Sequence, residues 1–133
     1  MTRRHEARRR AVALLYEADV GGRSPLDLLE ERRSLGHDVP RFTEELVRGV
    51  AERIEELDRL IGTHAEGWTV PRLAAVDRAV LRLACHEILH RDEVPAAVAV
   101  DEAVEAAKEL STEDSGRFVN GILGRIVRGC AAS

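Results

Sequence analysis

The chain has 133 residues, 44% of them hydrophobic and 33% charged, which suits one globular domain and excludes a disordered chain. Its two cysteines are too few for a disulfide framework, and no apolar run approaches the roughly 18 residues of a membrane span. We therefore expect a cytoplasmic protein without membrane contact. Because only 3% of the residues are aromatic, its core must be built from Leu, Val, Ile and Ala.

Charge is sorted along the chain. Residues 1–10, here called the arginine arm, hold five arginines and one acid, a formal charge of +4. Since the whole chain stands at −4, the remaining residues must sum to −8. A basic arm on an acidic body indicates binding to a polyanion, most simply nucleic acid, whereas the alternative is a solvated terminus. The arginines of the arm are Arg3, Arg4, Arg8, Arg9 and Arg10.

The first half of the chain predicts three helices. Apolar residues over 7–18 share one stripe, and a Gly-Gly pair ends that helix. Ser24, followed by a proline, is a typical N-cap and opens a short second helix that stops near Gly36. An apolar period of three or four residues then continues over 42–61, which predicts a third helix of about five turns.

The second half has the same period. Segments 73–88 and 98–110 predict two helices separated by a Val-Pro pair, with a possible break in the first near Asp77. Ser111 with Asp114 can cap a last helix, whose apolar positions extend almost to the end of the chain.

These elements predict an all-α fold. Period-two alternation, the pattern of a strand, does not compete anywhere with the helical period. We expect a single domain over residues 1–133, a compact bundle of six or seven helices in two packed halves. The seam between the halves is expected near 64–69.

One motif suggests a metal site. The sequence HEILH, from His86 to His90, matches the H-E-x-x-H pattern in which two histidines bind zinc and Glu87 acts as a general base. A zinc peptidase needs a third ligand, but no histidine follows and Glu109 lies in a helix with its own amphipathic pattern. In the other interpretation both histidines face solvent on an ordinary helix whose core side includes Ile88. We favour that interpretation and expect no metal, no cofactor and no catalytic residue.

The last predicted helix contains an Asn-Gly pair, Asn120-Gly121, which costs about 1 kcal/mol relative to alanine inside a helix. A tight helix–helix crossing is the expected reason for Gly121. Packing alone does not explain Asn120.

Several blocks of the sequence resemble the family of the bacterial transcription antitermination factor NusB. They follow the arginine arm in the family's order and cover nearly the whole chain, leaving mainly 21–41 unmatched. The final block is the most specific. The blocks are AVALLYE (11–17), LVRGV (46–50), VDRAVLRLA (76–84), DEAVEAAK (101–108) and FVNGIL (118–123).

The resemblance implies a non-catalytic RNA-binding protein built as two helical bundles. NusB-like proteins bind the boxA sequence of nascent ribosomal RNA operon transcripts together with a ribosomal small-subunit protein, NusE, and help RNA polymerase to pass terminators. The implied partners are therefore single-stranded boxA RNA, NusE and, indirectly, the RNA polymerase antitermination complex.

The resemblance also implies site residues. The arginine arm would contact phosphates, and unpaired bases would stack on Tyr16 and Phe118, although either ring could instead fill the core. Arg82 and Arg117 could add phosphate or base contacts. The RNA-binding candidates are Arg3, Arg4, Arg8, Arg9, Tyr16, Arg82, Asp114, Arg117 and Phe118.

Two further positions bear on partners. Asp77 corresponds to an acidic position at the family's protein-partner surface, and Asp114 to a position the family uses near RNA. Glu6 stands where some relatives have arginine, with Arg9 and Arg10 partly restoring the charge. The alternatives to an RNA-binding factor are a protein–protein adaptor, whose arm only aids solubility, and the zinc peptidase.

Overall fold

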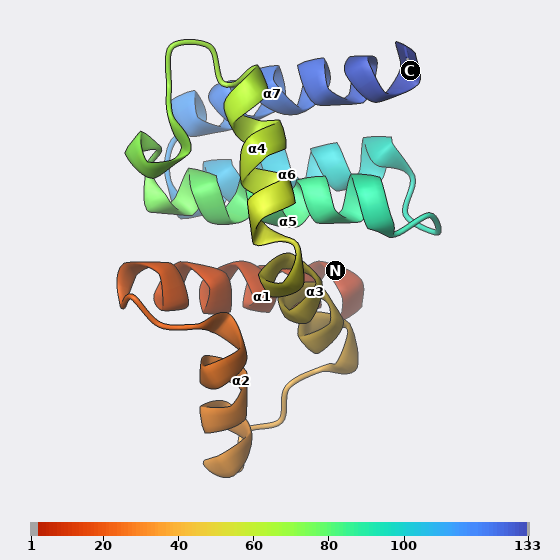
Figure 1. Ribbon diagram of the computed structural model, residues 1–133. Coiled ribbons are helices and arrows are strands. Elements are labelled where there is room, and N and C mark those ends of the chain that lie inside the picture. The colour runs from red at the N-terminus through yellow and green to blue at the C-terminus, as the bar shows by residue number, and fades with distance from the viewer. Residues whose placement is uncertain (1–2, 133) are drawn as a thin grey trace.

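Seven α-helices and one 3₁₀ turn make up the part of the chain that the computed structural model describes, residues 3–132 (Figure 1). The first two residues of the arginine arm and Ser133 lie outside it. The all-α prediction, with six or seven helices in two packed halves, is confirmed. The elements are α1 (Arg3–Val20), α2 (Pro25–Ser34), α3 (Arg41–Glu52), α4 (Ile54–His64), η1 (Val70–Arg72), α5 (Ala75–His90), α6 (Ala96–Leu110) and α7 (Glu113–Ala132).

Helices α1, α2 and α3 pack together as one half, and α4 to α7 form the other. Figure 1 shows α2 reaching away from α1 on the side opposite to α5. The halves meet where α5 lies against α1 and α3. One hydrophobic core runs through this contact, because fully buried residues such as Ala11, Val50 and Leu81 come from all three helices.

The expected helix over 42–61 is wrong, because the chain breaks at Arg53. That residue has φ −120° and ψ 20°, and its N–H bonds to the carbonyl of Val50, which ends α3 before α4 begins. Since α4 packs on α5 and α7, the two halves divide at Arg53. Segment 64–69, the expected seam, joins α4 to η1 within the second half.

The two helix caps predicted from the sequence have different outcomes. Ser24 accepts a hydrogen bond from the Leu26 N–H at 3.3 Å and caps α2 as expected. At α7, however, the cap is neither Ser111 nor Asp114. Thr112 Oγ1 accepts from the N–H of Ser115 at 3.0 Å.

The tight helix crossing lies at Gly49, and the expectation for Gly121 is wrong. A Cβ added at Gly121 would meet only the Arg125 side chain, at 3.7 Å. At Gly49 an added Cβ would lie 2.1 Å from the ring of His86, so only glycine lets α3 approach α5 there.

Candidate nucleic-acid interface

The arginines at the start of α1 differ in what they contact. Arg3, Arg4 and Arg10 are exposed. The guanidinium carbon of Arg4 lies 4.3 Å from the centre of the Phe42 ring on α3, a cation–π contact that leaves its N–H groups at the surface. These three residues keep their side chains at the surface of the protein.

Arg8 is buried, with 5% of its surface exposed. Its Nε and Nη2 donate to the two carboxylate oxygens of Glu87 on α5 at 2.9 and 2.8 Å, a bidentate pair inside the protein. A guanidinium held this way has no surface to offer RNA. The interpretation of Arg8 as a phosphate contact therefore does not fit the structure, which gives it a role in joining α1 to α5.

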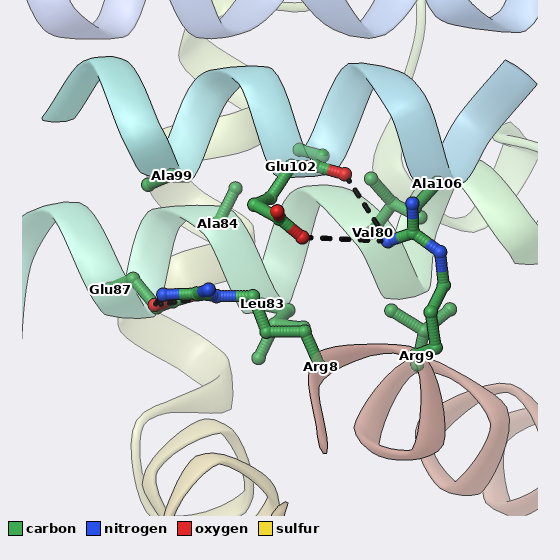
Figure 2. Close-up of a pocket in the computed structure, with 11 residues that line it drawn as sticks. Arg8, Arg9, Val80, Leu83, Ala84, Glu87, Ala99, Glu102 and Ala106 are labelled. Carbon is green, nitrogen blue, oxygen red and sulfur yellow. Dashed lines mark hydrogen bonds and ion pairs between the residues drawn. The ribbon is translucent and has the colours of Figure 1, made fainter. Parts of the chain in front are cut away.

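Arg8 and Arg9 both line a small cavity of about 10 Å³ between α1, α5 and α6, and Figure 2 shows them at opposite ends of it. Arg9 donates from Nε to Glu109 at 2.6 Å, and its Nη1 lies 3.9 Å from the carboxylate of Glu102. The neighbouring His5 also contacts Glu102, at 3.0 Å. The Nη2 of Arg9 is buried and has no hydrogen-bond partner among the described residues.

Tyr16 lies on the exposed side of α1 and keeps 40% of its surface accessible. Its ring lines a groove of about 720 Å³. The groove is largely apolar, with Val20 and Leu110 also exposed along it. The lining residues are Arg9, Val12, Ala13, Tyr16, Glu17, Val20, Gly21, Val76 and Leu110. Tyr16 is therefore a surface residue, available for stacking.

A second cavity, of about 420 Å³, lies next to the groove at the first turn of α5. Val76 lines the groove, and its neighbour Asp77 lines the cavity. Phe118 is half-buried at its edge and meets Trp68 edge-on, with ring centres 6.2 Å apart. Trp68 is 49% exposed. The sequence patterns did not identify Trp68 as a candidate binding residue. It is the only tryptophan of an aromatic-poor chain and lies next to a helix start, and these two features could have identified it.

Asp77 forms part of the wall of this second cavity. It is buried, and its Oδ2 accepts a hydrogen bond from the Ser115 hydroxyl at 3.5 Å, while Oδ1 has no hydrogen-bond partner among the described residues. Burial raises the pKa of Asp77, and the Ser115 hydrogen bond opposes that rise. The wall of the cavity thus includes a buried carboxylate oxygen without a partner among the described residues.

The remaining candidates divide between surface and interior. Asp114 and Arg117 are exposed at the start of α7 and pair with each other. Arg82 instead donates from Nε and Nη2 to both carboxylate oxygens of Asp58 on α4, at 2.7 and 2.8 Å. That pairing joins α4 to α5, and Nη1 of Arg82 also lies 4.0 Å from the carboxylate of Asp19 on α1.

The H-E-x-x-H residues are engaged in packing. The expectation that both histidines face solvent is wrong for His86, which is 3% exposed and lies against Gly49. Burial, with Arg53 adding to it, lowers the pKa of His86 to about 4. His90 Nε2 lies 2.6 Å from the carboxylate of Glu56. Within residues 3–132, no group of three or more His, Cys, Asp or Glu side chains is arranged to hold a metal ion.

None of the helices described is both long and apolar enough to cross a membrane.

Comparisons with known proteins agree with this architecture. The NusB family model matches residues 5–128. The transcription antitermination protein NusB of Saccharopolyspora erythraea is 54% identical over 130 residues, which cover 95% of this chain and 87% of that protein. The structure of T. maritima NusB has a TM-score of 0.83 at 37% identity, covering 96% of this chain and 92% of its own.

A further structure, of antitermination factors NusB and NusE in complex with dsRNA, has a TM-score of 0.82 at 30% identity and covers 97% of this chain and 99% of its own. The family model thus spans most of the chain, and a relative far above 30% identity aligns over nearly all of it. The chain belongs to the NusB family.

Proposed function

We propose that this chain is a non-enzymatic transcription antitermination factor. In this role it binds single-stranded boxA-type RNA in ribosomal RNA operon transcripts together with the ribosomal small-subunit protein NusE. Family membership supports the proposal, as does the likeness to a structure in which NusB and NusE are found with RNA. The observation that carries it is the exposed Tyr16 ring, which stands beside the arginines of α1 in an open groove.

The geometry supports different roles for different residues of the interface, some binding phosphates and others binding bases. Arg3, Arg4 and Arg10 would neutralise phosphates, which supplies affinity without sequence choice. Tyr16 would stack on one unpaired base, and the Trp68–Phe118 pair would receive another. Asp114 and Arg117 are at the surface near that pair, on the first two turns of α7.

The protein partner would use the cavity that contains Asp77. It would meet the part of the wall formed by Leu73 and Asp77, while Trp68 and Phe118 in the same wall receive the base. The buried Oδ1 of Asp77 has no partner among the described residues. A basic side chain of the ribosomal protein NusE would match that carboxylate.

Fluorescence polarisation of labelled boxA RNA, with a scrambled RNA as control, tests the proposal. We expect NusE to tighten RNA binding, and RNA to tighten NusE binding by the same factor, because coupling free energies are reciprocal. Equal affinity for boxA and scrambled RNA, with NusE present or absent, would contradict the proposal. NusE binding without any RNA binding would indicate a protein adaptor instead.

A further inference from the structure

A third cavity lies between α1 and α2, and three of its seven lining residues come from the stretch that the family resemblance leaves unmatched. It has a volume of about 120 Å³, and its wall includes two guanidinium groups and an imidazole. The lining residues are Arg10, Ala13, Leu14, Glu17, Arg32, His37 and Val39. We call this cavity the α1–α2 cleft.

The cleft carries more positive than negative charge. Arg10 donates from Nη2 to the backbone carbonyl of Asp38 at 3.0 Å, a bond that leaves its charge uncompensated. Arg32 donates from Nη2 to both carboxylate oxygens of Glu17, at 2.7 and 2.6 Å. Glu17 is the only acid in the lining, so one of the two arginine charges remains unbalanced.

Hydrogen-bond donors also remain for a ligand. A guanidinium has five N–H donors, and the hydrogen bonds that Arg10 and Arg32 make to described residues each engage only Nη2. His37 adds a ring nitrogen to the same wall. Arginine forks match the oxygens of a phosphate group, and a space of this volume equals roughly four waters, enough for one such group.

The cleft shares a rim with the Tyr16 groove. Ala13 and Glu17, one turn apart on α1, line both spaces. Ala13 is exposed and small, so little side chain stands between them at that point. A nucleotide whose base occupies the groove can therefore carry a phosphate across α1 into the cleft.

We propose that the α1–α2 cleft, through Arg10 and Arg32, binds a backbone phosphate of the RNA strand whose base lies on Tyr16. This inference rests on the proposed RNA-binding function and extends the RNA path from the arginine arm to α2. The Glu17–Arg32 pair limits the attraction, because the carboxylate faces the same space as the phosphate.

Salt-dependent RNA binding of three single variants tests the proposal. Arg10→Gln removes the cation without freeing a carboxylate, and we expect the slope of log affinity against log salt to fall by roughly 0.7. Between 50 and 200 mM salt, the loss of affinity would then be about 2.6-fold smaller than for the wild type. Glu17→Gln, which releases Arg32 into the cleft, should tighten binding.

Arg33→Gln is the matched control, since Arg33 follows Arg32 on α2 but pairs with Glu44 and does not line the cleft. It should keep the wild-type slope. Far-ultraviolet circular dichroism and melting temperature confirm that each variant is folded. If the wild type binds RNA but Arg10→Gln and Glu17→Gln match Arg33→Gln, the cleft assignment is overturned while the proposed function stands.

A Glu17→Gln/Arg32→Gln double variant measures the contribution of Arg32 on α2 separately from that of the arginine arm. Compared with Glu17→Gln, it should again lose about 0.7 in slope. Titration with inorganic phosphate, followed by NMR of the arginine and histidine side chains, gives the second arm of the experiment. Weak phosphate binding that RNA displaces supports the proposal. Saturation of the cleft by inorganic phosphate that RNA does not displace would overturn it in favour of a free-anion site.

Discussion

At the scale of single residues, arginines that look equivalent in the sequence have different roles. Arg4 rests on an aromatic ring at the surface, whereas Arg8 is paired with a carboxylate in the interior. The helical period places both on one side of α1. Only the position of Glu87, which is 79 residues further along the chain, decides which of them reaches solvent.

Replacing Arg8 should cost stability. Arg8→Ala leaves the Glu87 carboxylate buried without its partner, so we expect the free energy of unfolding to fall by about 3–5 kcal/mol. Urea denaturation measures this, with Arg3→Ala as the exposed control that changes little. Replacing both partners with methionine should restore much of the loss. An Arg8→Ala protein of native stability whose RNA binding weakens would contradict this role.

Replacing Tyr16 should affect binding and spare stability. Tyr16→Leu keeps apolar volume but removes most of the stacking surface, so RNA affinity should drop by about 1–3 kcal/mol with an unchanged salt slope. The same change at Phe118 should also lower the melting temperature, because that ring is half-buried against Trp68. Polarisation and thermal melts separate the two effects. A lowered melting temperature with normal affinity for Tyr16→Leu would show that its ring only packs.

At the scale of helices, the apolar period was sufficient to predict almost every element. It did not reveal the break at Arg53, because the apolar positions of α3 and α4 continue through the break with the same spacing. It also failed for His86 and Glu87. An apolar periodicity predicts that polar side chains face solvent. His86 is instead buried against Gly49 on α3, and Glu87 is buried with Arg8 of α1.

The α3–α5 crossing should make stability depend on pH. The pKa of His86 is about 4 in the folded protein, against about 6.5 in an unfolded chain, so protonation favours unfolding. Its contribution is fully present above pH 6.5 and is lost as the pH falls toward 4, at most about 3 kcal/mol. Urea denaturation across this range should show a shallower pH dependence for His86→Gln than for His90→Gln, whose ring is exposed. Identical pH profiles would rule out His86 as the cause.

At the scale of the whole molecule, one ion-pair network joins the two halves of the fold. Arg78 on α5 donates to Asp19 on α1 and to the carbonyls of Val70, Pro71 and Leu73. It therefore links the helix that carries Tyr16 to the segment after Trp68. Neither the groove beside Tyr16 nor the cavity that contains Asp77 could be predicted from the sequence, because each is formed by elements far apart in the chain.

Removing this link should loosen Trp68. Arg78→Met frees three carbonyls and one carboxylate, so we expect a loss of about 1–3 kcal/mol in stability and stronger acrylamide quenching of Trp68 fluorescence. Asp19→Asn should increase quenching in the same sense, although Asp19 is on α1. Arg48→Gln, on α3 and paired with Glu44, is the control and should leave Trp68 unchanged. Unaltered quenching in Asp19→Asn would mean that the network does not link α1 to Trp68.

The pairing of Arg8 and Arg9 with acids of the body has a consequence for selectivity. An arm with five unpaired cations would adhere to any nucleic acid, because phosphate attraction is indifferent to sequence. In this fold two of the five arginines already pair with carboxylates of the protein. An RNA of arbitrary sequence therefore gains little binding free energy from these two arginines, because few counterions remain on them to be released. A larger share of the binding free energy must then come from contacts with bases. Pairing inside the protein thereby lowers the affinity that the arm alone would have for RNA of arbitrary sequence.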